Sequence, residues 1–185
     1  MLSSPFSILD NKTEKIVTFF LAIMTICIGY AMLSIDYFLI NDICENGIIS
    51  FELAKDTRTS QAILNSWDAN AKINAGLSLG LDFLFLTIYP TLIALLIHKL
   101  NKTLWLGKPF YLVGLILLFS QFFTACFYAI ENIGLIEILL GNSNKNLALM
   151  AYYFAFMKFT LIATALIYLA INFIIYITRN TIKNE

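Results

Sequence analysis

The chain has 185 residues, of which 59% are hydrophobic and only 13% charged, and its mean hydropathy is +0.79. This composition excludes a soluble domain with a solvated surface and indicates an integral membrane protein. Twelve basic and twelve acidic residues cancel without forming a basic stripe, which argues against nucleic acid as a partner. The three cysteines are widely spaced, so we expect free thiols.

Four apolar segments are long enough for membrane-spanning helices, which need roughly 20 residues each. They cover residues 16–40, 72–98, 110–140 and 147–178. We therefore predict an all-α fold: a four-helix transmembrane bundle that forms a single integral membrane domain over residues 1–185. Membrane lipids are its expected surroundings.

The distribution of Lys and Arg predicts the orientation of the bundle. Seven of them flank the ends of the spans on the side of the termini: Lys12, Lys15, Lys99, Lys102, Lys108, Arg179 and Lys183. Four flank the opposite side: Lys55, Arg58, Lys72 and Lys145. Since basic residues concentrate in cytoplasmic loops, we expect both termini in the cytoplasm and the 41–71 loop outside. The apolar part of the first span exceeds the core of a cleaved signal, so we expect it to be retained.

The 41–71 loop contains apolar residues at helical spacing, in the run FELAKDTRTSQAILNSW. This spacing predicts short amphipathic helices that lie on the membrane interface. Trp67 is expected to anchor them there.

Each span carries an ionisable residue. Asp82 lies ten residues after Lys72, at a depth of roughly 15 Å for a straight helix. Glu131 lies nine residues before the outer end of the third span, and Lys158 eleven residues after the start of the fourth. These three groups should therefore meet at one level, with Asp36 above them near the outer mouth.

A lone charge at this depth costs at least about 2.5–3.5 kcal/mol, so such groups usually face the bundle and pair. Lys158 between Asp82 and Glu131 leaves one negative charge for a proton, a ligand cation or another donor. Helical periodicity places further polar side chains on the same inward faces. The candidate ligand-binding residues are Asp36, Ser78, Asp82, Tyr89, Thr124, Tyr128, Glu131, Asn132 and Lys158.

Three functions fit this polar cluster. The first is a binding protein or enzyme for a small amphiphilic, lipid-like ligand. The second is an ion- or proton-coupled transporter, which would need a homo-oligomer to enclose a path. The third is a structural or assembly subunit in which buried ion pairs hold the helices in register. We predict no cofactor and no metal site, because the single histidine, His98, has lysine neighbours and no ligand set.

Four short segments carry a resemblance: AILNSW, SLGLDFLFLTIY, AIENIGLIEILLG and MKFTLI. In order and spacing they resemble an uncharacterised family of small bacterial four-span membrane proteins. Members carry a Trp before an LDFLF helix, a later acidic residue followed by Asn, and a Lys-Phe near the start of the last span. The resemblance covers roughly residues 50–170 and implies the fold, the polar cluster and a bacterial inner membrane, but no activity.

Size and layout are also similar to those of the sterol-isomerase and sigma-2-receptor-like four-helix group. The motifs of that group do not align with this chain. The likeness therefore implies an architecture and carries no function.

Overall fold

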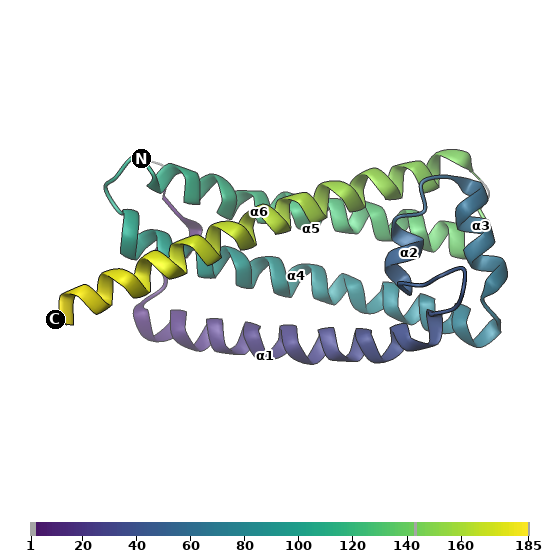
Figure 1. Cartoon of the computed structure of the whole chain (residues 1–185), viewed down its shortest axis with the longest axis horizontal. Helices are drawn as coiled ribbons and strands as arrows, with labels where there is room; N and C mark the ends of the chain where they lie inside the picture. Colours follow the sequence, from purple (N-terminus) through teal and green to yellow (C-terminus); the bar gives the residue numbers. More distant parts are fainter. Residues whose placement is uncertain (1–2, 143, 185) are drawn as a thin grey trace.

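The computed structural model describes residues 3–142 and 144–184 and confirms the all-α fold (Figure 1). Four long helices are apolar enough to cross a membrane. They are α1 (Asn11–Asp36), α4 (Ala69–Trp105), α5 (Tyr111–Leu139) and α6 (Lys145–Asn184). Both termini lie at one end of the bundle, which we call the terminal end, and the short helices α2 and α3 lie at the other, the loop end.

The helices differ from the predicted spans mainly at their ends. The first begins five residues earlier than predicted, because the Asp10 carboxylate accepts hydrogen bonds from the backbone N–H groups of Lys12 and Thr13. It also ends earlier, where the chain turns into the 3₁₀ helix η2 (Tyr37–Leu39). The second and fourth spans run on to Trp105 and Asn184. Hydropathy marks where the apolar residues stop, but helical hydrogen bonding continues through the polar residues beyond them.

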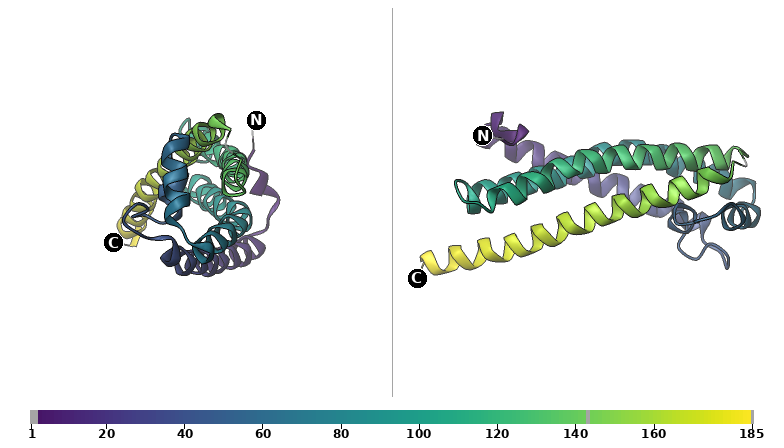
Figure 2. Two further views of the ribbon diagram at one scale, coloured as in Figure 1. Left: turned by 90° about the vertical axis from the view of Figure 1, so that its right-hand side faces the viewer. Right: turned by 90° about the horizontal axis from the view of Figure 1, so that it is seen from above.

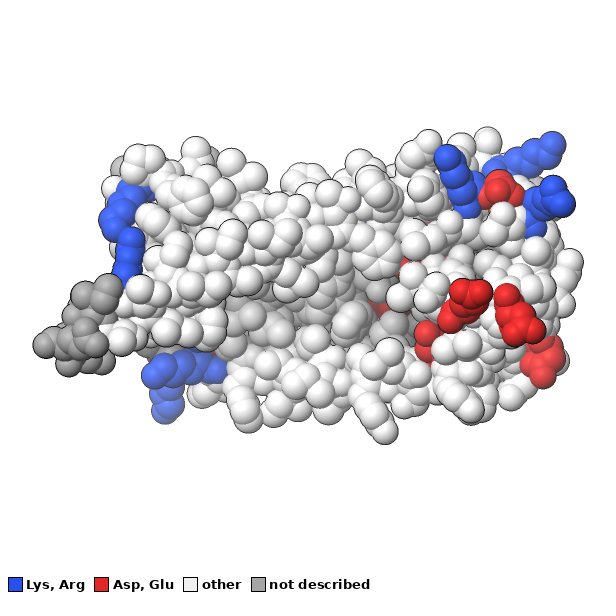
Figure 3. All heavy atoms as spheres, viewed as in Figure 1, with Lys and Arg blue, Asp and Glu red and all other residues white. Residues whose placement is uncertain are grey.

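Helix α4 is the centre of the bundle. It packs along α1, α5 and α6, and α5 also packs along α6. Among the helix pairs that pack closely in the described residues, α1 packs mainly on α4. The molecule is hollowed between α1 and the helices above it, with acidic atoms visible in the hollow toward the loop end (Figure 3).

The outward faces of the long helices are apolar. Helix α1 exposes large hydrophobic side chains along most of its length, among them Phe19, Ile26, Tyr30 and Leu33. Helix α6 does the same with Phe156, Ile167, Phe173 and Ile174. These faces suit contact with membrane lipid, as expected of a multi-pass membrane protein.

The 41–71 loop forms the predicted short helices, α2 (Ile48–Glu52) and α3 (Thr57–Ser66). They cover the loop end of the bundle, as the end-on view shows (Figure 2). Their buried side chains join one cluster with the ends of α4, α5 and α6: Leu39, Cys44, Ile48, Phe51, Ile63, Leu64, Trp67, Ala75, Leu79, Leu135, Ile138 and Ala151.

The expectation that Trp67 anchors the loop at the membrane interface is wrong. Its side chain is only 3% exposed, and its indole N–H donates to the carbonyl of Leu39 at 2.9 Å. The Phe51 ring lies against it, with ring centroids 5.3 Å apart. The physical reason is that the bundle end offers an apolar surface and a backbone acceptor, which satisfy both parts of the indole.

Polar contacts also hold the terminal end together. The Asn101 amide donates to the carbonyl of Tyr111 at 2.9 Å and accepts from the Tyr168 hydroxyl at 3.2 Å. The Trp105 indole N–H donates to Asn172 on α6. These bonds tie α4 to both α5 and α6 at the end opposite the loop helices.

Candidate functional site

A buried ion-pair cluster lies in the half of the bundle nearer the loop end. The Lys158 ammonium on α6 lies 2.8 Å from the Glu131 carboxylate on α5 and 3.1 Å from the Glu52 carboxylate on α2. The side chains of Lys158 and Glu131 are fully buried, and that of Glu52 is 4% exposed. Three helices are therefore joined by one lysine.

Asp82 joins this cluster through a tyrosine. The Tyr128 hydroxyl donates to the Asp82 carboxylate at 2.9 Å. The Lys158 ammonium lies over the ring of the same tyrosine, 3.6 Å from its centroid, in a cation–π contact. Asp82, Glu131 and Lys158 all face the interior, but within the described residues Asp82 makes no direct ion pair with Lys158.

Glu52 is the member that sequence reasoning missed, because its segment was predicted to lie on the membrane surface. Its buried carboxylate comes from the five-residue helix α2, which starts at a sharp turn. Gly47 in that turn has φ +54°, and the following N–H, of Ile48, donates to Asp36 at 2.6 Å. A side chain at position 47 would collide with the Asp36 carboxylate, so glycine is required there. The sequence signal that could have indicated a buried Glu52 is its position as the single acidic residue in the largely apolar run IISFELA.

The buried Cys44 thiol also contacts this turn. It donates to the carbonyl of Gly47 at 3.0 Å. Burial raises the pKa of this thiol to about 11, so it stays protonated at neutral pH.

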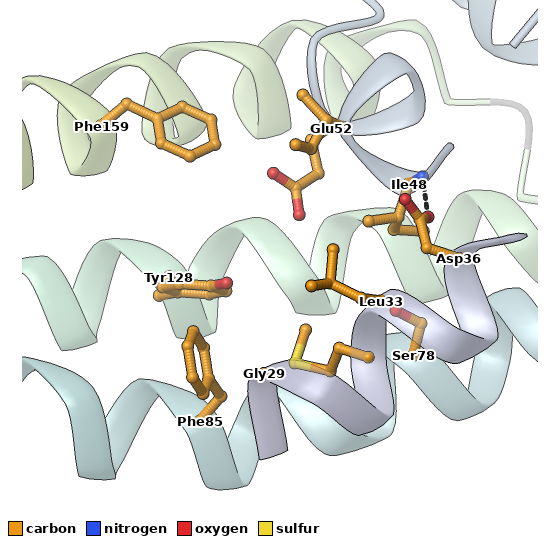
Figure 4. Close-up of a pocket in the computed structure, with 11 residues that line it drawn as sticks. Gly29, Leu33, Asp36, Ile48, Glu52, Ser78, Phe85, Tyr128 and Phe159 are labelled. Atoms are coloured by element: carbon orange, nitrogen blue, oxygen red, sulfur yellow. Dashed lines mark hydrogen bonds between the residues drawn. The ribbon is translucent and has the colours of Figure 1, made fainter. Parts of the chain in front are cut away.

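A cavity of about 270 Å³ lies beside the cluster, between α1, α2 and the helices α4 to α6. Its walls are mostly apolar, and its polar side chains are Asp36, Glu52, Ser78 and Tyr128. Figure 4 shows the Glu52 carboxylate pointing into it from α2, with Tyr128, Phe85 and Phe159 toward one end. Leu33, Asp36 and Ser78 line the other end.

The remaining predicted residues divide into two groups. Ser78 and Asn132 are fully buried, and their side-chain polar atoms have no hydrogen-bond partner within the described part of the chain. Thr124 is buried too, but its hydroxyl bonds to the carbonyl of Ser120 in its own helix. Tyr89 packs its ring against Phe85 and Tyr128. The structure thus gives Thr124 and Tyr89 no polar contact with the cluster.

The charges of the cluster do not balance. Glu52, Asp82 and Glu131 face a single buried cation, Lys158, which leaves two formal negative charges. Asp36 adds another carboxylate at the cavity wall. Uncompensated buried charge costs several kcal/mol per ion. Protons, a metal cation or a cationic ligand must therefore offset the excess.

Fold and site together define a multi-pass, four-helix membrane protein with an acidic ion-pair cluster buried between its helices. No family model matches the chain, and the comparisons with curated proteins and with solved structures found no match either. The resemblance to small bacterial four-span proteins stays a prediction.

Proposed function

We propose that the protein binds a small amphiphilic molecule with a cationic head in the cavity beside Glu52. The single observation that carries this proposal is the combination, in one cavity, of mostly apolar walls and carboxylates in excess over the buried cation. Ligand sites are commonly apolar spaces with a few convergent polar groups that orient the ligand.

The charges favour a cationic head over a neutral or anionic one. A positively charged group near Glu52 and Asp36 would offset part of the negative excess, whereas an anionic head would add to it. Lys158 would hold Glu131 and the Tyr128 ring in place while Glu52 contacts the ligand.

The cavity volume limits what it can enclose. About 270 Å³ is slightly below the range of roughly 300–1,000 Å³ typical of sites for drug-sized ligands. The cavity would therefore hold the head and the first part of the apolar chain. The rest of the chain would lie between α1 and α6, which are not a closely packed pair among the described residues, and would extend from there toward membrane lipid.

The bias of Lys and Arg supports a cytoplasmic location for both termini. The cavity would then lie in the outer half of the membrane. The resemblance to bacterial four-span proteins favours the inner membrane as the location.

One observation favours a second candidate function, an ion- or proton-coupled transporter. The two excess negative charges are carried by fully or nearly fully buried carboxylates, and intramembrane carboxylates of this kind often mark ion pathways. A homo-oligomer would then enclose the path. A purely structural role fits less well, because an ion pair that only holds helices in register needs no surplus of acids.

Binding of a single-chain amine to the purified protein tests the first proposal. We expect dodecylammonium to bind and the neutral dodecanol to bind at least ten times more weakly, because only the amine offsets charge. Glu52→Gln should weaken amine binding about tenfold or more, since a hydrogen bond to a charged group is worth about 1.5–3 kcal/mol.

Glu137→Gln is the matched control, because Glu137 is exposed near the loop end and bonds only to Asn142 within the described residues. Equal binding of amine and alcohol, or equal loss in both variants, would refute the proposal. Mass spectrometry of co-purified molecules adds a second readout, in which a cationic amphiphile is the expected species.

A further inference from the structure

Four polar atoms in the loop-end half of the bundle are buried without a hydrogen-bond partner among the described residues. They are Ser78 Oγ, Asp82 Oδ2, and both Oδ1 and Nδ2 of Asn132; Glu131 Oε2 is not counted with them, because it lies 2.8 Å from the Lys158 ammonium. All three side chains are 0% exposed. Leaving a buried polar group without a hydrogen-bond partner is destabilising, so a cluster of such groups indicates a missing partner.

The Ser78 hydroxyl differs from the other hydroxyls on the spans. Beyond the first turn of each long helix, every other described Ser or Thr hydroxyl donates to a carbonyl three or four positions earlier in its own helix. Such back-bonding is the usual way for a hydroxyl to be satisfied in an apolar environment. Ser78 does not use it, and instead lines the cavity beside α2.

The three residues come from two helices that pack together, α4 and α5. Ser78 and Asp82 lie one turn apart on α4 and so share a face of that helix. Asn132, on the neighbouring helix α5, has its amide within reach of the Asp82 carboxylate, although the geometry between the two falls short of a hydrogen bond. Tyr128 already donates to Oδ1 of Asp82, which leaves Oδ2 for another partner.

We propose that Ser78, Asp82 and Asn132 bind a dehydrated monovalent metal cation of about the size of sodium. Their hydroxyl, carboxylate and amide oxygens are the hard ligands that such an ion prefers. One carboxylate in the set matches one positive charge. A divalent ion would place two positive charges against this single carboxylate.

The cation would also compensate the negative charge of Asp82, which makes no direct ion pair with Lys158 among the described residues. A water molecule would satisfy the hydrogen bonds but would leave the Asp82 charge buried. Of the three residues, Ser78 lines the cavity, so the ion would enter from that side. The sequence predicts no metal site when only ligand sets that include histidine are considered. A hydroxyl, an amide and a single carboxylate form no recognisable metal motif in a sequence.

Thermal unfolding of the purified full chain, with no amphiphile added, tests the inference at constant ionic strength in sodium, potassium or choline chloride. We expect sodium to raise Tm by about 5–10 °C over choline when it is about 100-fold above its Kd. Direct binding of ²²Na⁺ should approach one ion per chain.

Ser78→Ala should abolish most of the sodium-dependent rise while the protein still folds, because only a hydroxyl is removed. Asp82→Asn should abolish binding of ²²Na⁺ altogether. Ser34→Ala is the matched control, since the Ser34 hydroxyl already bonds to the carbonyl of Tyr30 and is exposed on α1, and it should keep the full response.

Equal Tm values in sodium, potassium and choline, with no ²²Na⁺ bound, would overturn the inference and leave water or a proton as the partner of Asp82. Stabilisation by calcium or magnesium without any effect of sodium would overturn it as well. Neither result bears on the amphiphile proposal, which is tested by a different ligand at Glu52.

Discussion

The Asp36 carboxylate accepts a hydrogen bond from the backbone N–H of Ile48 at 2.6 Å, and so joins the end of α1 to the start of α2. Glu52 lies one turn farther along α2 and contacts Lys158 on α6. The position of the buried cluster therefore depends on a turn in the loop outside the long helices. Four expected outcomes follow from this arrangement and from the packing of the bundle.

Gly47→Ala should destabilise the protein more than the same change at a glycine with free space around it. Gly141 has a positive φ of +95° and open space where a Cβ would lie, so Gly141→Ala should cost only the backbone strain, about 1–2 kcal/mol. At Gly47 the new methyl group also collides with Asp36 and displaces its hydrogen bond, which adds about 1.5–3 kcal/mol. Tm values of the two variants measure the difference. Equal losses would show that the Asp36 contact contributes nothing.

Lys158→Met should be severely destabilising, by about 3–5 kcal/mol, because it leaves Glu52 and Glu131 buried without their cation. The triple change Glu52→Gln, Glu131→Gln and Lys158→Met should recover most of this loss, since it removes the charges together. Yield of monodisperse protein and Tm in detergent provide the measurements. Lys145→Met, at an exposed position, serves as the control and should stay within about 0.5 kcal/mol of the parent. A mild Lys158→Met phenotype would mean that the acids are already neutral.

Tyr128→Phe should cost about 1.5–3 kcal/mol, because it deletes the donor to the Asp82 carboxylate and keeps the ring beneath Lys158. Tyr89→Phe is the comparison, as this ring lies next to Tyr128 and contributes packing. Chemical denaturation of both variants in the same detergent separates the two effects. If both substitutions have the same small effect, the Tyr128–Asp82 bond is not a stabilising contact.

Gly114→Ala should weaken the terminal end of the bundle, whereas Gly80→Ala should be tolerated. A methyl group at position 114 would collide with the Asn101 amide and break its bonds to Tyr111 and Tyr168. At Gly80 there is nothing within 4 Å, and alanine favours helix by up to about 1 kcal/mol. Thermal unfolding should therefore give shifts of opposite sign. A tolerated Gly114→Ala would show that α4 and α5 can separate slightly at no cost.

The number of long helices and their approximate ends were predictable from the sequence. A span must be apolar over a length that the membrane sets, and this requirement is visible in one dimension. The common level of Asp82, Glu131 and Lys158 was also predictable, because an α-helix converts residue number into depth. All three are buried, as that reasoning expected.

The tertiary structure alone decided which partners these residues have. Glu52 reaches Lys158 because a glycine turn directs α2 inward, and Trp67 is buried because the bundle end accommodates its ring and its N–H group. Asp82 and Lys158 both contact Tyr128, Asp82 at its hydroxyl and Lys158 at its ring. The Ser78 hydroxyl, beside the cavity, does not bond to the backbone of its own helix. The helical periodicity of a sequence predicts which face of a helix a side chain occupies. The contacts made there depend on the rotation and spacing of neighbouring helices, which are set by packing between residues far apart in the chain.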